Sequence, residues 1–185
     1  MNDTMLVILA GGQGSRMGGN KPLQPYGRTT LIEATLDRLR PQAHDIQINA
    51  RPDLAADLTY LGLPLIFDAS DFADLGPLSG VRTAVREAAR LGRDYVVTAP
   101  CDMPALPSDM IMRLRNEEAD IVHFRGERDY PLCALWRTSL LPALDAALTA
   151  ARPEGGVRVM RFIASQASIA LRGDPAAFIN INTLS

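Results

Sequence analysis

The feature that most constrains the fold is a regular alternation of short apolar runs with segments of helical periodicity over residues 5–124. Met5 to Leu9 reads MLVIL and stops at glycines, which is typical of a strand buried in a parallel sheet. Similar runs predict strands at residues 45–49, 64–67, 95–99 and 121–124. Apolar residues at helical spacing predict helices at residues 30–39, 53–60, 77–91 and 108–115. The alternation predicts a three-layer, Rossmann-like α/β fold, with helices on both faces of a mostly parallel central sheet.

The rhythm of the sequence changes after residue 124. An apolar run at residues 130–136 follows a turn-like segment, and helices are predicted at residues 140–151 and 157–164. Short strands are predicted at residues 168–171 and 177–181. Ser108 is expected to cap the helix that it begins. With 185 residues and no linker or repeat, the chain is expected to form a single domain, residues 1–185.

Composition argues against several classes of function. The net charge of -2 gives no electrostatic reason to expect binding to nucleic acid or to an acidic membrane. Cys101 and Cys133 stand outside any CxxC or Cys/His cluster, which argues against a disulfide framework or a zinc site. The apolar runs are too short to span a bilayer, and the N-terminus lacks a secretory pattern, so a cytoplasmic protein is expected.

A glycine-rich segment directly follows the first predicted strand. Residues 9–21 read LAGGQGSRMGGNK and contain five glycines. Glycines let a backbone approach phosphates closely and turn its N–H groups toward them. The same segment holds Arg16 and Lys21, and 18 of the chain's 19 basic residues are arginine, so Lys21 is its only lysine. A flexible point charge that reaches a phosphate is a task for which lysine and arginine differ, and we assign that task to Lys21.

Two familiar phosphate-binding motifs do not fit this segment. A Walker loop requires glycine before its lysine and serine or threonine after it, whereas Asn20 and Pro22 flank Lys21. A dinucleotide fingerprint starting at Gly12 would need glycine where Met17 stands. The first well-defined helix begins only near residue 30, so we expect the loop itself to surround the phosphates.

Polar residues follow several of the other predicted strands. Asp102 lies in the sequence PCDMP after the 95–99 strand, at the sheet edge where open α/β folds bind ligands. A carboxylate at that edge suits Mg²⁺, which bridges triphosphate oxygens. Asp68 follows the 64–67 strand as a ligand or as a capping residue, and Asn49 ends the 45–49 strand as a nucleoside contact or as a turn residue.

These motifs together resemble a known group of enzymes. LAGGxxSRMGxxK, with GPLSG at residues 76–80 and PCDMP at residues 100–104, resembles the glycosyltransferase-A-like nucleotidyltransferases. The use of LAGG, with GERDYPLCALW at residues 126–136 and FININT at residues 178–183, makes the chain most similar to the molybdenum cofactor guanylyltransferase (MobA) family. The similarity extends over essentially the whole chain.

The resemblance implies transfer of GMP from GTP to molybdopterin that carries molybdenum, with release of pyrophosphate. It implies that catalysis depends on Lys21, Arg16 and Asp102, with Asp102 as the ligand of Mg²⁺. The nucleotide-binding residues that it implies are Leu9, Ala10, Gly11, Gly12, Lys21, Asn49, Asp68, Gly80 and Asp102. The acceptor-binding residues that it implies are Arg128, Asp129, Asn180 and Asn182. Residues 1–124 would then bind the nucleotide and residues 125–185 the acceptor.

Two other functions compete with this one. The first is a related transferase that uses CTP, or a sugar or alcohol phosphate as acceptor; the second is a protein that binds nucleotide without catalysis. The expected protein partners are an enzyme that supplies molybdenum-loaded molybdopterin and an apoenzyme that receives the product. Replacing Lys21 or Asp102 by alanine is expected to abolish turnover while leaving the melting temperature nearly unchanged.

Overall fold

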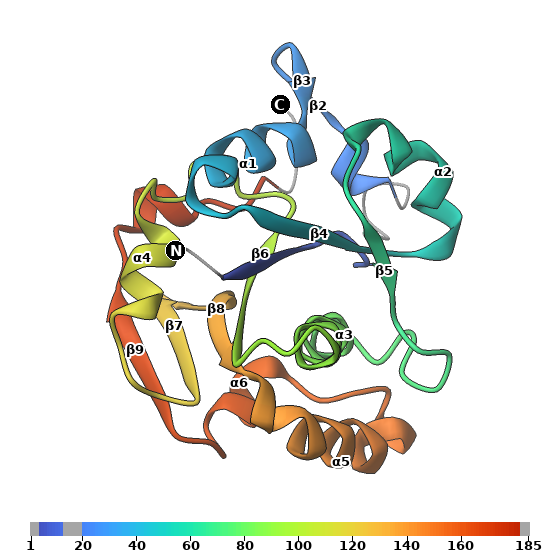
Figure 1. Ribbon diagram of the computed structural model, residues 1–185, viewed down its shortest axis with the longest axis vertical. Helices are drawn as coiled ribbons and strands as arrows, with labels where there is room; N and C mark the ends of the chain where they lie inside the picture. The colour runs from blue at the N-terminus through green and yellow to red at the C-terminus, as the bar shows by residue number, and fades with distance from the viewer. Residues whose placement is uncertain (1–3, 13–19, 182–185) are drawn as a thin grey trace.

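A seven-stranded sheet forms the centre of the molecule in the computed structural model, which describes residues 4–12 and 20–181 (Figure 1). Its strand order is β5-β4-β1-β6-β8-β7-β9, and a separate hairpin pairs β2 with β3. All neighbouring pairs in the sheet are parallel except those of β8, which is antiparallel to both β6 and β7. The strands are β1 (Met5–Leu9), β2 (Pro25–Tyr26), β3 (Thr29–Thr30), β4 (Asp45–Ala50), β5 (Leu65–Phe67), β6 (Tyr95–Pro100), β7 (Ile121–Arg125), β8 (Asp129–Arg137) and β9 (Ser168–Arg172).

Helices cover both faces of the sheet and make the predicted three-layer arrangement (Figure 1). The α-helices are α1 (Leu31–Leu39), α2 (Ala55–Leu58), α3 (Pro77–Arg90), α4 (Met110–Arg115), α5 (Leu141–Ala151) and α6 (Val159–Ile163). Short 3-10 turns lie at Lys21–Leu23, Arg40–Gln42, Pro52–Leu54, Thr59–Leu61, Thr138–Leu140, Arg152–Glu154 and Pro175–Phe178. None of the helices in the described ranges is long and apolar enough to cross a membrane.

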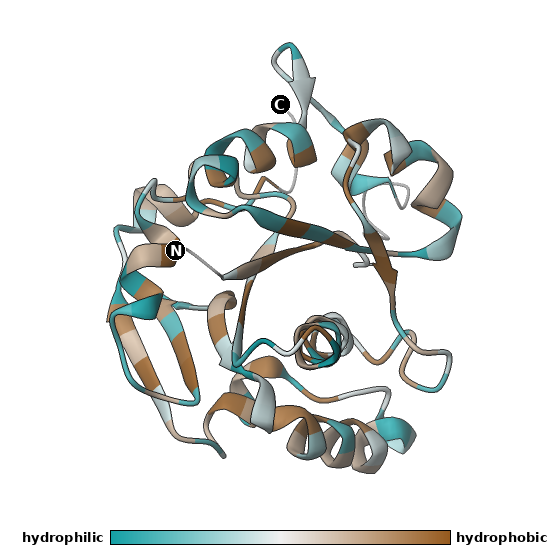
Figure 2. Ribbon diagram, viewed as in Figure 1, coloured by the Kyte–Doolittle hydropathy of each residue, from teal (hydrophilic) through white to brown (hydrophobic). Residues whose placement is uncertain are grey.

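The period of two in β1 divides the core between the two faces. Leu6 and Ile8 pack with α1, α2 and α4, whereas Met5 and Val7 pack with α3, α5 and α6. All four side chains are fully buried, because a central parallel strand has helices on both sides. Figure 2 shows hydrophobic colouring along β1, β5 and β6, and mixed colouring on α3.

The first residues of the helices show which of the helix starts predicted from capping residues are confirmed. Thr30 and Glu33 form a reciprocal capping box at α1, where the predicted helix begins. Gly76, with φ 88°, leads into Pro77 at the first turn of α3. The expectation that Ser108 caps the next helix was wrong, because α4 begins at Met110 with Asp109 at its N-cap position and no side-chain cap.

The predicted strand at residues 177–181 was also wrong. Pro175–Phe178 form a 3-10 turn instead, which Asp174 caps by accepting a hydrogen bond from the Ala176 N–H at 3.0 Å. Pro175 has no N–H for a sheet ladder, and Phe178 leaves the sheet direction to fill a core position with 1% exposure. The chain therefore crosses the end of the sheet here rather than adding a strand to it.

Candidate functional site

A cleft of about 440 Å³ opens at the edge where the parallel strands end. The register explains which residues meet there, because Leu9 on β1 lies opposite both Asn49 on β4 and Pro100 on β6. The loops that follow these three strands therefore open onto one place, as expected for an open α/β sheet. Ten residues predicted from the sequence line the cleft: Leu9, Ala10, Gly11, Gly12, Lys21, Asn49, Asp68, Gly80, Asp102 and Asn180.

Three of these residues form a polar cluster from distant parts of the chain. The Lys21 ammonium group pairs with Asp102 Oδ2 and donates a hydrogen bond to Asn180 Oδ1 at 3.0 Å. Asp102 is only 5% exposed, and its other oxygen, Oδ1, has no hydrogen-bond partner among the described residues. A buried carboxylate oxygen without a donor is costly unless something else binds it. This oxygen is therefore suited to hold a cation.

The C-terminal segment owes its place in the cluster to an aromatic anchor. Phe178 stacks on Tyr130 with 4.6 Å between ring centroids, and it also contacts Phe124 at 4.9 Å. Three residues further on, the Ile181 N–H donates to the Asp102 carbonyl at 3.0 Å. The anchor and this hydrogen bond hold Asn180 between them, against Lys21.

Asn49 and Asp68 are joined by hydrogen bonds on the other side of the cleft. Asn49 Nδ2 donates to Asp68 Oδ1 at 2.9 Å, and the Thr83 hydroxyl donates to the same oxygen at 2.7 Å. A Cβ added to Gly80 would lie 2.6 Å from Asn49 Oδ1, and one added to Gly11 would lie 3.2 Å from it. The two glycines therefore leave the room that the Asn49 amide occupies.

Several cleft residues were not predicted from the sequence. They are Pro22, Asp74, Gly76, Pro77, Pro100, Cys101, Leu132 and Gly155. Gly76 and Pro77 begin α3, so the positive end of a 14-residue helix points at the cleft. The GPLSG motif was the signal for this wall, but only its last glycine was assigned to the site. Burial raises the pKa of the Cys101 thiol, so it is protonated and unreactive at neutral pH.

Arg128 and Asp129 lie at the same sheet edge but do not line the cleft. Arg128 lies over the Tyr130 ring, with 5.7 Å from its guanidinium carbon to the centroid. Asp129 Oδ1 accepts a hydrogen bond from Arg125 Nε at 2.6 Å and lies 3.3 Å from His123 Nε2. The hydrogen bond from Arg125, together with the contact to His123, lowers the pKa of Asp129. Arg16 and Asn182, which were also predicted, lie outside the described residues.

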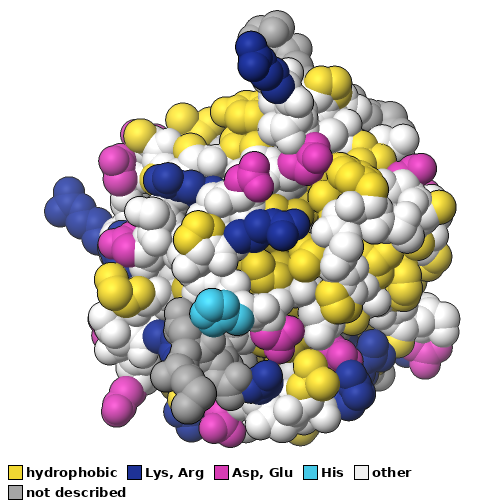
Figure 3. All heavy atoms as spheres, turned by 45° about the horizontal axis from the view of Figure 1, so that its top comes forward, with side chains coloured by type: hydrophobic (Ala, Val, Ile, Leu, Met, Phe, Trp, Pro, Cys, Tyr) yellow, Lys and Arg dark blue, Asp and Glu magenta, His cyan; other side chains and the backbone are white. Residues whose placement is uncertain are grey.

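The site offers one buried carboxylate rather than a metal-binding cage. Within the described ranges, no three His, Cys, Asp or Glu side chains are close enough to hold a metal ion together. A donor set of one carboxylate fits Mg²⁺, which keeps most of its waters and takes other ligands from substrate phosphates. On the face shown in Figure 3, basic and acidic side chains lie interspersed among hydrophobic and uncharged ones.

Curated relatives are similar to this chain over most of its length. A molybdenum cofactor guanylyltransferase of Cereibacter sphaeroides is 41% identical over 95% of this chain and 89% of its own length. Proteins of the same name from Pasteurella multocida and Cupriavidus necator are 38% and 39% identical, over 96% and 99% of this chain and 94% of their own lengths.

Solved structures show the same fold. Molybdopterin-guanine dinucleotide biosynthesis protein A of Archaeoglobus fulgidus superposes with a TM-score of 0.78 at 21% identity, over 97% of this chain and 93% of its own. A cytidylyltransferase of Leptospira borgpetersenii reaches a TM-score of 0.69 at 17% identity, over 99% and 82% of the two chains. Residues 6–169 match the MobA-like NTP transferase domain. The chain therefore belongs to the MobA-like NTP transferase family.

Proposed function

We propose that this chain transfers GMP from GTP to molybdenum-loaded molybdopterin, forming molybdopterin guanine dinucleotide and pyrophosphate. The observation that carries the proposal is the meeting of Lys21 with Asp102 at the end of a glycine-lined cleft, where one Asp102 oxygen lacks a partner among the described residues. The names of relatives about 40% identical over nearly the whole chain support the choice of GTP and molybdopterin.

The nucleotide-binding roles are proposed from the lining of the cleft. The backbone of residues 9–12 and the Asn49–Asp68 pair would contact the nucleoside, with Gly80 leaving room for Asn49. Lys21, together with Arg16 from the same glycine-rich segment, would neutralise phosphate charge. Asp102 would hold Mg²⁺, which when bound supplies positive charge that polarises the phosphates and the leaving pyrophosphate.

The proposed reaction requires positioning rather than proton abstraction. The terminal phosphate oxygen of molybdopterin forms a bond to the α-phosphorus of GTP, and the bond from that phosphorus to the oxygen bridging to the β-phosphate breaks. The nucleophile is already an oxyanion and the leaving group is pyrophosphate, so no general base is needed. What the protein contributes is alignment and charge neutralisation.

The acceptor is assigned to residues 125–185, and the nucleotide to residues 1–124. Asn180 supports this assignment because it reaches Lys21 from the C-terminal segment. Arg128 and Asp129, at the same sheet edge, would extend the acceptor side beyond the cleft. Asn182, which lies outside the described residues, is assigned to the acceptor from the sequence alone. We propose a cytoplasmic enzyme that meets its molybdopterin donor and its acceptor apoenzymes transiently.

A pyrophosphate-release assay with GTP, Mg²⁺ and molybdenum-loaded molybdopterin tests the function directly. We expect release with GTP and not with CTP, ATP or UTP, and a matching order in the rise of melting temperature that each nucleotide causes. Stronger stabilisation by CTP would make the chain a cytidylyltransferase. Stabilisation by GTP without pyrophosphate release would leave a nucleotide-binding protein without catalytic activity.

A further inference from the structure

The loop between β5 and α3, residues 68–76, forms one wall of the cleft and is held by an aromatic anchor of its own. Asp68 begins the loop, while Asp74 and Gly76 line the cleft near its end. Between them, Phe72 points inward and is only 9% exposed. The Phe72 and Ala73 N–H groups both donate to the Ala69 carbonyl, at 2.8 Å and 2.9 Å, so the middle of the loop is a compact turn.

Two arginines from different elements lie over the Phe72 ring. The guanidinium carbon of Arg82, on α3, is 4.6 Å from the ring centroid, and that of Arg152, just after α5, is 5.2 Å from it. Arg82 Nε also pairs with Asp145 Oδ1 on α5 at 2.7 Å, and Arg152 pairs with Asp71 at 3.4 Å. These contacts connect the loop to α3 and to the end of α5, which cover the same face of the sheet.

The end of the loop adopts a backbone conformation that needs such support. Asp74 has φ 64° and is the one non-glycine residue with positive φ in the described part of the chain. This conformation costs about 1 kcal/mol or more and persists where its surroundings enforce it. The backbone of the next residue, Leu75, lies close to Gly156. A Cβ added to Gly156 would lie 2.0 Å from the Leu75 carbonyl oxygen.

We infer that Phe72 and Arg82 are positioning residues of the nucleotide side of the cleft. They do not line it, but they fix the wall that presents Asp68 at one end and Asp74 with the α3 N-terminus at the other. The inference rests on the proposed function in that the ligand of this wall is GTP. Loosening the anchor should weaken binding of GTP while leaving the Lys21–Asp102 pair and the chemical step intact.

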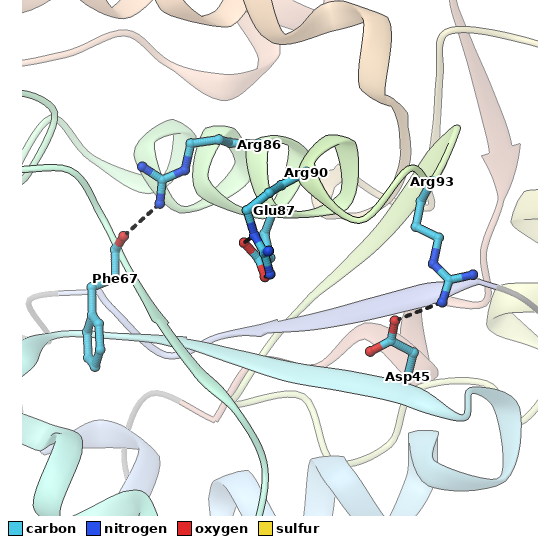
Figure 4. Close-up of polar contacts among 6 residues, drawn as sticks. All are labelled: Asp45, Phe67, Arg86, Glu87, Arg90 and Arg93. Atoms are coloured by element: carbon cyan, nitrogen blue, oxygen red, sulfur yellow. Dashed lines mark hydrogen bonds and ion pairs between the residues drawn. The ribbon is translucent and has the colours of Figure 1, made fainter.

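The test compares Phe72→Ala, Arg82→Ala and Phe72→Tyr in the full chain, with varied GTP and with Mg²⁺ and molybdenum-loaded molybdopterin held constant. We expect KM for GTP to rise about 5- to 30-fold in the two alanine variants with kcat within about 2-fold of wild type. Phe72→Tyr, which keeps the ring, should restore KM. The matched control is Arg90→Ala, since Arg90 lies on the same helix but is 66% exposed and pairs with Glu87 (Figure 4).

Binding is read separately from catalysis, as the rise in melting temperature that GTP causes. A smaller rise in Arg82→Ala than in Arg90→Ala supports the inference even where wild type releases no pyrophosphate, a result that would overturn only the proposed function. Should Phe72→Ala fail to fold, Arg152→Ala is used in its place, because Arg152 is 43% exposed and touches the same ring. Unchanged KM and unchanged stabilisation by GTP in the arginine variants would overturn the inference.

Discussion

At the scale of single residues, Lys21 makes contacts within the protein as well as lining the cleft. Its ammonium group pairs with the buried Asp102 carboxylate and bonds to Asn180. Removing it would leave that carboxylate buried without its counter-charge, which costs free energy of folding. The expectation that Lys21→Ala leaves the melting temperature nearly unchanged is therefore revised, because the sequence did not show this pair.

We predict that Lys21→Met lowers pyrophosphate release by about 100-fold or more and the free energy of unfolding by about 1–3 kcal/mol. Asp102→Asn, which keeps the shape and removes the charge, should lose activity to a similar degree. The double variant should be more stable than the sum of the single losses implies, since the two groups interact. Turnover assays and urea denaturation measure both effects. Wild-type turnover in Lys21→Met would contradict the role proposed for the ammonium group.

The burial of His123 leads us to predict that the free energy of unfolding depends on pH. Burial lowers its pKa despite the hydrogen bond with Asp129, so the ring is neutral at pH 7. The unfolded chain, with an ordinary pKa of about 6.5, takes up the proton first, so the free energy of unfolding falls as the pH falls through that value. Asp129, whose pKa is lowered, loses its own contribution only at more acidic pH.

We therefore expect His123→Gln to lose less stability than wild type between pH 7 and about pH 5. Urea denaturation at several pH values in this window measures the difference. His44→Gln is the matched control, because His44 is exposed, and it should follow wild type. Equal losses in wild type and His123→Gln would show that other groups carry the dependence.

At the scale of elements, the C-terminal segment depends on one side chain for its position. Phe178 packs on Tyr130 and lies close to Gly173. A Cβ added to Gly173 would be 2.6 Å from the Phe178 ring.

We predict that Phe178→Ala costs about 3–5 kcal/mol of stability and also lowers kcat/KM for the acceptor, because Asn180 loses its place beside Lys21. Ile179→Ala is the control, since Ile179 is 54% exposed. Steady-state kinetics with varied molybdopterin and urea denaturation measure the two effects. A Phe178→Ala enzyme with unchanged acceptor kinetics would separate the segment from the acceptor side.

Elements with strong hydrophobic periodicity could be predicted from the sequence. Strand β1 was predicted to the residue and α3 to within one residue, because burial on defined faces determines both patterns. The direction of β8 could not be predicted, since an apolar run reads the same in either direction. The hairpin at residues 25–30 is too short for a periodic signal.

The site was predictable to the extent that it lies in loops directly after predicted strands. Asp102 follows this rule, Lys21 ends the loop after β1, and Asn49 lies near the end of β4. The register of β1 with β4 and β6 brings these three strand ends together. Gly155 lies far from any strand end in sequence, and the packing of Leu75 against Gly156 brings its segment to the loop that holds Asp74. Such long-range packing leaves no local trace in the sequence.

At the scale of the whole molecule, the two proposed parts share one sheet. Trp136 on β8 donates to the Thr98 hydroxyl on β6 at 2.9 Å, and Thr98 in turn donates to the Leu132 carbonyl at 2.8 Å. These two bonds, the first of them buried, cross the proposed boundary at residue 124. The expected consequence is that residues 125–185 do not unfold apart from residues 1–124.

We predict one cooperative transition in urea. Trp136 is the only tryptophan, so its fluorescence reports on the later part, while far-UV circular dichroism reports on the whole chain. The two curves should coincide within error. An earlier fluorescence transition would show that the acceptor part is a separate folding unit.

The reversed direction of β8 has a consequence for how such an enzyme changes over time. In a purely parallel sheet, only segments that follow strands reach the ligand edge, and each also ties a strand to its covering helix. The turn at residues 126–128 also follows a strand, β7, but it leads directly into the antiparallel strand β8 with no helix between them. Surface turns tolerate insertions and substitutions. Recognition of a new acceptor can therefore evolve in this turn while the layers proposed to bind the nucleotide keep their geometry.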